Sequence, residues 1–214
     1  MHYAAHLGKD KILKKLMKAQ GEKILEQKKN AFMHLCFSIV GQQLSVKVAA
    51  VIRKRFLGLY GGKFPSPQEI LDTPLATFRS IGFSNAKASY VHNVAEFALS
   101  YGMDDRKLKK MHDEEVIEYL TQIKGVGRWT TEMLLMFTMK REDVFAVDDL
   151  GIQVAMTGLY KLDKTDKKKM KSAMLEIAET FNCKKMIWHG WPEDKRYSTL
   201  DGTKELAAMY NEAN

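Results

Sequence analysis

Apolar residues along much of the chain recur at spacings of three and four, the period of a helix with one buried face. Three stretches carry this pattern most clearly, with apolar positions at Ile12, Leu13, Leu16 and Met17; Val48, Val51, Ile52 and Phe56; and Met170, Met174, Ile177 and Phe181. No Asn-Gly or Asp-Gly pair joins two alternating runs before Asp201-Gly202, and that pair lacks strand-like flanks. The pattern predicts an all-α protein.

Helix boundaries carry signals of their own, and nothing divides the chain into separate modules. The sequence Ser66-Pro67-Gln68-Glu69 is a capping-box pattern with proline at the first helical position, so a helix is expected to start there. Residues 61–65 and 101–105 read as loops within one compact unit. Because the chain has no repeat of fixed period and no low-complexity linker, we expect residues 1–214 to form a single functional unit.

Composition narrows the class of protein. The chain has 214 residues, 45% of them hydrophobic, which suits a globular protein with a substantial core. Two cysteines, Cys36 and Cys183, cannot build a disulfide framework or a four-cysteine zinc or iron–sulfur site, so both are expected to be packing residues. No apolar run approaches the roughly 18 to 20 residues of a membrane span, and the N-terminus is unlike a signal peptide. We therefore expect an intracellular protein without a membrane partner.

The charge balance leaves two interpretations open. The chain carries 34 lysines and arginines against 26 aspartates and glutamates, a net charge of +8. Such a surplus fits a polyanionic partner, and it fits equally a lysine-rich solvated surface. The six histidines show no metal-ligand spacing, so surface or core positions are expected for them.

The most informative stretch consists of two helical segments, 116–123 and 129–139, that a Gly125-Val126-Gly127 turn separates. Two glycines permit positive φ angles and let another molecule approach the backbone closely. Free N–H groups and the dipole at the start of the second helix would then suit a phosphate. The same residues also fit a plain helix–helix turn.

A pair of carboxylates follows this hairpin. The apolar run 144–147 must pack in a core, and it ends in Asp148-Asp149, where a new helix is expected to begin. An aspartate at such a place is commonly the N-cap of the helix. Two aspartates in a row leave one for other chemistry.

These segments together resemble the HhH-GPD superfamily of DNA glycosylases. The resemblance lies in residues 125–130, Gly-Val-Gly-Arg-Trp-Thr, followed at the expected interval by residues 147–152, Val-Asp-Asp-Leu-Gly-Ile. Residues 38–45, Ser-Ile-Val-Gly-Gln-Gln-Leu-Ser, are similar to the segment beside the base pocket in the 3-methyladenine DNA glycosylase II group. Residues 82–88 are similar to the loop that carries the DNA-inserting side chain. The resemblance covers about residues 6 to 180.

The resemblance implies a fold of two helical lobes with a central cleft. One lobe would span approximately residues 31–148, with the helix-hairpin-helix at 113–139, and the other would comprise residues 1–30 and 149–214. After Thr180 the sequence departs from the family, and Trp191, Pro192, Arg196 and Tyr197 resemble only a distorted form of its closing segment. This departure leaves the far wall of the base pocket, and with it the substrate range, open.

The resemblance also implies roles for particular residues. Asp149 would be the catalytic carboxylate, with Asp148 the weaker candidate. The residues that would contact DNA at the hairpin and at the inserting loop are Gly125, Val126, Gly127, Arg128, Phe83, Ser84, Asn85 and Lys87. Local sequence by itself makes Ser84 an N-cap, whereas the family likeness makes Asn85 the side chain that fills the gap left by a flipped base, with Phe83 supplying apolar bulk. Main-chain carbonyls of Thr121, Ile123 and Val126 would be able to hold a structural Na⁺ or K⁺.

The base pocket would be lined by Trp129, Gln42 and Met133. Members of the superfamily that also cleave the strand place a Schiff-base lysine where this chain has Trp129, so the resemblance implies a monofunctional enzyme without lyase activity. Trp129 would then act as a stacking surface, although a core tryptophan at the start of a buried helix explains it too.

The function implied is hydrolysis of the N-glycosidic bond of alkylated bases, of the 3-methyladenine and 7-methylguanine type, in base excision repair. The partner would be double-stranded DNA with damaged bases, the protein a monomer that requires no cofactor, and its location the cytoplasm or nucleoid of a prokaryote or the nucleus of a eukaryote. A non-enzymatic helix-hairpin-helix DNA-binding module, which would not need Asp149, stays an alternative. So does a glycosylase for deaminated, oxidised or mismatched bases.

Overall fold

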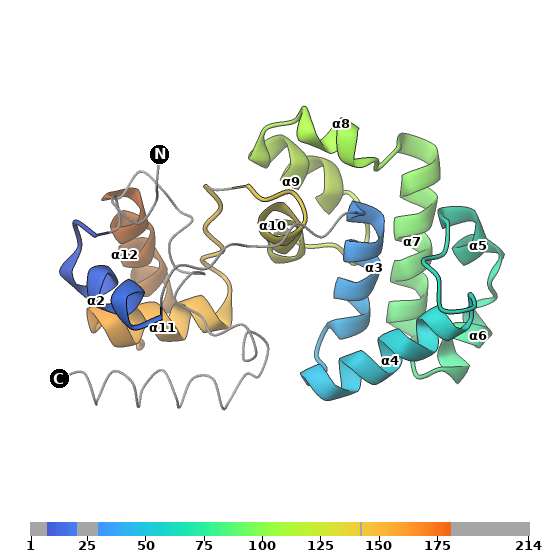
Figure 1. The fold of residues 1–214 in the computed structure, drawn as a ribbon, viewed down its shortest axis with the longest axis horizontal. Coiled ribbons are helices and arrows are strands. Elements are labelled where there is room, and N and C mark those ends of the chain that lie inside the picture. The colour runs from blue at the N-terminus through green and yellow to red at the C-terminus, as the bar shows by residue number, and fades with distance from the viewer. Residues whose placement is uncertain (1–7, 21–29, 142, 181–214) are drawn as a thin grey trace. The chain divides into compact units, whose positions relative to one another are not determined.

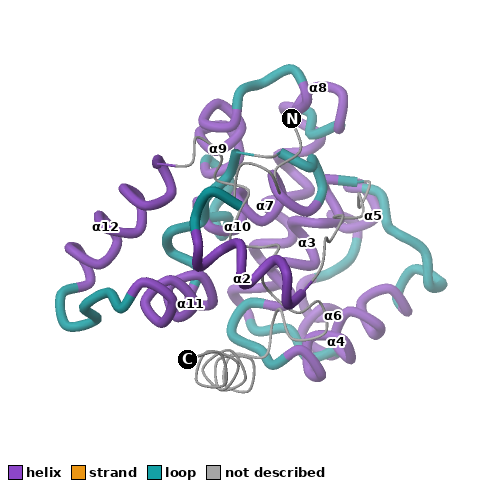
Figure 2. Tube along the Cα trace, turned by 60° about the vertical axis from the view of Figure 1, so that its left-hand side comes forward, coloured by secondary structure: helices purple, strands orange, loops and turns teal. Residues whose placement is uncertain are grey.

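The computed structural model describes residues 8–20, 30–141 and 143–180, and their regular structure consists of helices alone (Figures 1 and 2). With the labels of Figure 1, the helices are α2 (Lys11–Gln20), α3 (Ala31–Gly41), α4 (Val46–Gly58), α5 (Pro67–Asp72), α6 (Leu75–Ser80), α7 (Asn85–Tyr101), α8 (Asp105–Lys109), α9 (Asp113–Thr121), α10 (Arg128–Phe137), α11 (Leu150–Tyr160) and α12 (Lys167–Thr180). The predicted all-α class is confirmed. Cys183 and the segment in which the sequence leaves the family pattern lie outside the described residues.

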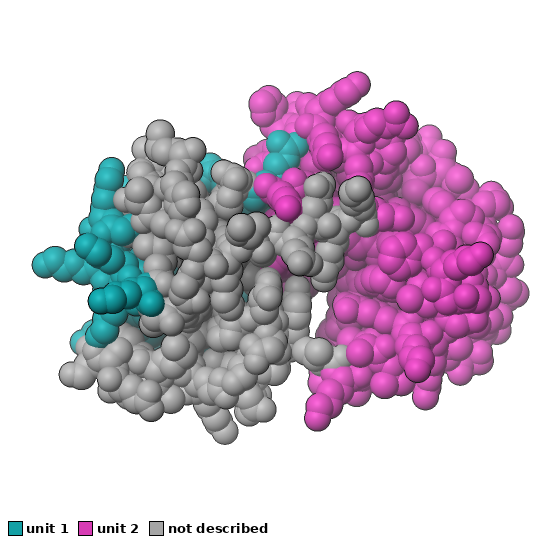
Figure 3. Space-filling model, viewed as in Figure 1, with its two compact units in different colours: residues 1–25, 141–214 teal, residues 26–140 magenta. Residues whose placement is uncertain are grey.

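Contacts along the chain divide it into two units (Figure 3). One comprises residues 1–25 and 141–214, and the other residues 26–140. The chain thus leaves the first unit, completes the second and returns. The lobes expected from the family likeness, 31–148 against 1–30 with 149–214, stay a prediction.

The second unit is built around α3 and α7. Helix α7 lies between α3 on one side and α5 and α6 on the other, while α10 packs against α9 and α3 (Figure 1). Helix α3 is buried along most of its length, at Ala31, Phe32, Met33, Leu35, Cys36, Ile39 and Val40. Cys36 is fully buried, as predicted for a packing residue, and burial raises the pKa of its thiol.

Helix ends in this unit are fixed by side chains. Ser66 and Glu69 form the predicted capping box: the Ser66 N–H donates to Glu69 Oε2 at 2.7 Å and the Glu69 N–H to Ser66 Oγ at 3.2 Å. The pKa of the Glu69 carboxyl is lowered because both the N–H and the hydroxyl of Ser66 donate to its Oε2. The start of α3 is capped from a distance, because the Asp105 carboxylate accepts the N–H groups of Asn30 at 3.3 Å and Ala31 at 3.1 Å. This contact joins segments about 75 residues apart.

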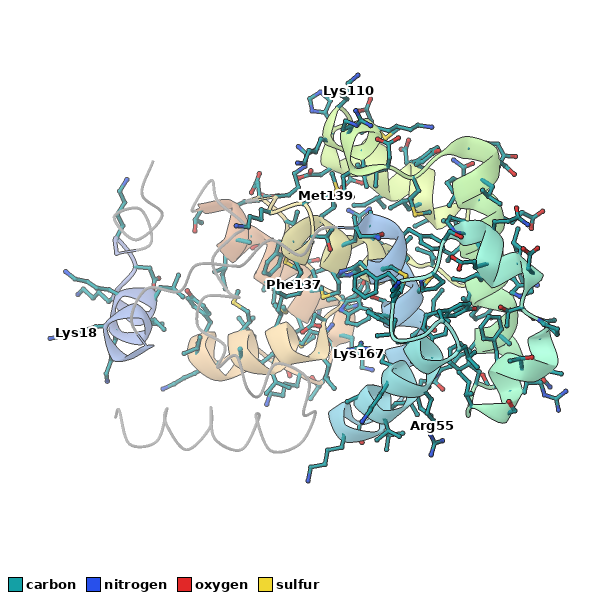
Figure 4. The ribbon with its side chains drawn as sticks, turned by 45° about the vertical axis from the view of Figure 1, so that its right-hand side comes forward. Lys18, Arg55, Lys110, Phe137, Met139 and Lys167 are labelled. Atoms are coloured by element: carbon teal, nitrogen blue, oxygen red, sulfur yellow. The ribbon has the colours of Figure 1, made fainter. Side chains whose placement is uncertain are left out.

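The first unit packs α11 against α12. The side chains buried in these helices are Ile152, Ala155, Met156, Thr157, Met170, Met174 and Ala178. Basic side chains such as Lys18 of this unit, and Arg55 and Lys110 of the other, point outward (Figure 4). None of the described helices is both long and apolar enough to cross a bilayer.

An aromatic cluster joins α4, α6 and α7 within the second unit. Phe83 stacks on Phe56 and Phe78, with ring centroids 5.7 and 5.5 Å away, and the edges of Tyr60 and His92 close the cluster. Phe83 is only 5% exposed. The ring of Phe83 is therefore a core side chain, because stacking on two other buried rings removes its apolar surface from water. Its predicted contact with DNA stays a prediction.

Replacing Phe83 by alanine should lower the free energy of unfolding by about 3–5 kcal/mol, the usual cost of an aromatic-sized cavity. Chemical denaturation with urea measures this change. Phe64→Ala is the matched control, because Phe64 is 56% exposed, and it should cost less than about 1 kcal/mol. Similar small losses for both variants would show that Phe83 does not support the core.

Candidate functional site

The predicted hairpin between α9 and α10 is present, and a tight turn closes it. The Val126 N–H donates to the Ile123 carbonyl at 2.9 Å, and Gly125, third in the turn, has φ +103°. A positive φ at this position is the mark of a type II β-turn, which favours glycine. Helix α10 begins directly after it, with Gly127 as its N-cap.

The two glycines of the turn have different reasons to be glycine. A Cβ on Gly125 would lie 2.3 Å from the Tyr90 ring, so both its φ and its packing exclude a side chain. Gly127 has an ordinary extended backbone with φ −101°, and a Cβ there would meet no described atom within 4 Å. Of the two glycines, Gly125 is therefore the one that the described residues require, and they leave the space beside Gly127 open.

Side chains from distant helices hold the main chain of the turn. Gln42, predicted for the base pocket, donates from Nε2 to the Gly125 carbonyl at 3.3 Å, and Asn93 donates from Nδ2 to the Lys124 carbonyl at 3.0 Å. Lys87, predicted to bind DNA, directs its ammonium group to the Val40 carbonyl at 2.9 Å, and partial burial lowers its pKa. In this structure Gln42 and Lys87 therefore join elements of the protein to one another: Gln42 contacts the hairpin turn, and Lys87 connects α7 to the end of α3.

Arg128 links the two helices of the hairpin. Its guanidinium donates to both Glu114 oxygens, at 2.6 and 3.0 Å, and its Nε donates to Glu132 at 3.1 Å. Glu114 is the main cause of the raised pKa of Arg128. The Glu132 side chain is only 5% exposed, so the arginine compensates a buried charge. Its predicted contact with DNA stays a prediction, and the structure adds this internal role.

The remaining pocket and cation candidates lie on the same hairpin. Trp129 is half-buried near the start of α10, and Met133 is buried one turn later. Of the carbonyls predicted for a monovalent cation, those of Thr121, Ile123 and Val126, the Ile123 oxygen already accepts the turn hydrogen bond. Within the described residues, no three His, Cys, Asp or Glu side chains gather to hold a metal ion.

The carboxylates after the hairpin belong to the other unit and differ in environment. Asp149 is the N-cap of α11: its Oδ1 accepts the Ile152 N–H at 3.0 Å, and the residue is half-buried. Asp148 is exposed and forms an ion pair with Lys171 on α12. The sequence pattern suggested that one aspartate caps the helix and leaves the other for chemistry. In the structure the capping residue is the predicted catalytic one.

The loop before α7 has the conformation that its local sequence predicts. Ser84 is the N-cap, accepting the Lys87 N–H at 3.3 Å, and Asn85 is the exposed first residue of the helix. Sequence reasoning missed Asn93, Tyr90 and Glu132, which act on the hairpin from within it or from α7. The only available signal was the spacing of three between Lys87, Tyr90 and Asn93, which puts them on one face of α7.

An all-α chain whose glycine hairpin is followed by a capping aspartate is a helix-hairpin-helix protein. Residues 36–180 match the HhH-GPD superfamily of base excision DNA repair proteins, and the chain belongs to this family. The family assignment and the confirmed fold class agree.

The chain is similar in sequence and in structure to proteins named as 3-methyladenine DNA glycosylases. DNA-3-methyladenine glycosylase 1 of Schizosaccharomyces pombe is 36% identical over 171 residues, which are 79% of this chain and 75% of that protein. The structure of an S. pombe 3-methyladenine DNA glycosylase in complex with abasic DNA gives a TM-score of 0.76 at 33% identity, over 89% of this chain and 95% of that one. A DNA-3-methyladenine glycosidase of Bacillus halodurans gives 0.73 at 31% identity, over 97% and 89%.

Alanine substitutions at the two glycines should separate folding from DNA binding. Gly125→Ala must displace Tyr90 and adopt a strained φ, so it should cost about 2 kcal/mol or more in unfolding free energy. Gly127→Ala should cost less than about 1 kcal/mol and still weaken duplex binding, because a methyl group would occupy the open space at the start of α10. Thermal melts and fluorescence anisotropy with labelled duplex measure both effects. Wild-type affinity in folded Gly127→Ala would contradict this assignment.

Proposed function

We propose that this protein is a monofunctional DNA glycosylase that hydrolyses the N-glycosidic bond of alkylated bases, of the 3-methyladenine and 7-methylguanine type, in base excision repair. Its substrate is double-stranded DNA, and it acts inside the cell as a monomer. The observation that supports this most strongly is Asp149, a carboxylate held in position at the N-terminus of α11 in a chain of the HhH-GPD family. The names of its relatives support the class of base.

Chemistry on a base requires that the base leave the stack, at a cost of a few kcal/mol that is lowest for damaged bases. In this proposal Asn85 fills the gap, and Trp129 stacks on the extruded base. N-alkylation at a purine ring nitrogen leaves the base positively charged, so it is a good leaving group and a favourable partner for an indole. Little acid catalysis is then needed.

The remaining tasks are to stabilise the sugar cation that forms as the bond breaks and to position water. One ionised carboxylate in a desolvated pocket serves both. Asp149 takes this role, because its Oδ1 hydrogen bond to Ile152 fixes the side chain without consuming its charge. The glycosidic C–N bond breaks and a water oxygen bonds to the sugar carbon, so the reaction consumes one water and releases the neutral free base and one proton, leaving an abasic sugar. Cofactor chemistry is not required for it, and any Na⁺ or K⁺ at the hairpin carbonyls would be structural.

Asp149→Asn should reduce base release from methylated DNA by roughly 100-fold or more while leaving fold and DNA affinity close to wild type. Asparagine is as good an N-cap as aspartate, so this change removes the charge and keeps α11 capped. Asp148→Asn is the matched control and should retain activity, since it breaks only an exposed ion pair. Normal turnover in Asp149→Asn would favour the non-enzymatic DNA-binding alternative, and an inactive Asp148→Asn would move the role by one residue.

Strand cleavage should be absent, because no lysine stands at the position of Trp129 to attack the sugar carbon. Incubation with substrate DNA and borohydride should therefore trap no covalent protein–DNA adduct. Electrophoresis of the denatured mixture gives the answer. A trapped adduct would mean that another amine of this chain forms a Schiff base, and the enzyme would then be bifunctional.

A further inference from the structure

The central peptide of the hairpin turn, between Lys124 and Gly125, decides which way the turn presents a backbone N–H. Type I and type II turns close with the same hydrogen bond and differ by a reversal of this peptide. The φ of +103° at Gly125 corresponds to the type II orientation. Because a trans peptide is planar, its C=O and N–H point in opposite directions, so fixing the Lys124 carbonyl aims the Gly125 N–H.

Asn93 provides that fixed point. Its Nδ2 donates to the Lys124 carbonyl at 3.0 Å across 31 residues of sequence. Tyr90, one turn earlier on the same face of α7, packs against the Cα of Gly125 from the same helix. The carbonyl side of the central peptide therefore meets α7, and the Gly125 N–H points away from it. Among the described residues, none accepts a hydrogen bond from that N–H.

Gln42 holds a different peptide of the turn. It donates to the Gly125 carbonyl, and the N–H of that same peptide, on Val126, already donates inward to Ile123. Gln42 thus braces a peptide whose donor is used within the protein. Asn93 is the side chain that aims a donor outward.

From this geometry we infer that Asn93 is a positioning residue for DNA binding: by holding the Lys124 carbonyl it keeps the Gly125 N–H directed at a phosphate of the DNA backbone. The inference rests on the proposed function only in taking the hairpin as a phosphate-binding element. Asn93 itself touches no DNA. Without the Asn93 side chain the peptide between Lys124 and Gly125 can rotate, so the Gly125 N–H is no longer held in the binding orientation before DNA binds.

The test is the affinity of Asn93→Ala and Asn93→Asp for an undamaged duplex and for a duplex with a stable abasic-site analogue. Both variants should bind about three- to tenfold more weakly, the range expected for one hydrogen bond. Asn93→Asp should bind the duplex more weakly than Asn93→Ala, because both variants lose the donor to the Lys124 carbonyl and only the carboxylate adds a negative charge facing that oxygen. Gln68→Ala is the matched control: Gln68 is an exposed amide that pairs with Asp72 on α5, away from the hairpin, and its loss should leave affinity unchanged.

The salt dependence of the Kd distinguishes a positioning role of Asn93 from a loss of charge, and the measuring temperature distinguishes it from a loss of stability. Asn93→Ala removes no charge, so the slope of log Kd against log salt should match wild type although the Kd is larger. Binding is measured well below the melting temperature of each variant, so a role confined to stability would leave affinity intact. Wild-type affinity in folded Asn93→Ala, or a reduced slope, would overturn the inference.

The outcome is distinct from that of the proposed function, because duplex binding requires no base release. If Asn93→Ala weakens binding while the wild type releases no methylated base, the glycosylase proposal fails and the positioning role stands. If the wild type releases base and Asn93→Ala binds normally, the positioning role fails alone. A wild type that binds no duplex overturns both.

Discussion

Main-chain carbonyls at the ends of helices and in tight turns have no partner in their own element, so they are free to accept hydrogen bonds from other elements. In the second unit, Val40, Lys124 and Gly125 are such residues. Their carbonyls accept hydrogen bonds from Lys87, Asn93 and Gln42 respectively. The same bonds therefore satisfy the backbone and hold the end of α3, the start of α7 and the hairpin turn together. The geometry of the candidate DNA-binding turn depends on these three hydrogen bonds.

The charge of Arg128 at the start of α10 is balanced by two carboxylates of the hairpin. Arginine at the first position of a helix meets the positive end of the helix dipole, which is unfavourable alone. Glu114 and Glu132 offset this, and Arg128 in turn compensates the buried carboxylate of Glu132. The result is a helix start at which two carboxylates offset the charge of the half-exposed Arg128 side chain.

Sequence predicted those features that depend on neighbouring residues. Helical periodicity, the capping box at Ser66 and the N-cap at Ser84 need only local contacts, and all are present. The glycine hairpin likewise appears where its residues indicate. The core role of Phe83 could not be predicted from local sequence, because its two stacking partners, Phe56 and Phe78, come from other helices.

Long-range contacts also explain what the sequence left undecided at the candidate site. Nothing local distinguishes Asp148 from Asp149 as the cap, since the choice depends on where α11 begins and on Lys171 of α12. Asn93 and Tyr90 meet the hairpin only because α7 carries them there, and one face of a helix looks like any other until its neighbour is known.

The burial of Cys36 has a consequence for a protein proposed to work on alkylated DNA. Reagents that methylate ring nitrogens of bases also attack thiolates, so the conditions that create the substrate threaten reactive cysteines. Cys36 is fully buried in α3, and its raised pKa keeps the thiol protonated, which is the unreactive form. A buried, protonated thiol at this position is a poor target for the alkylating agents that modify DNA bases.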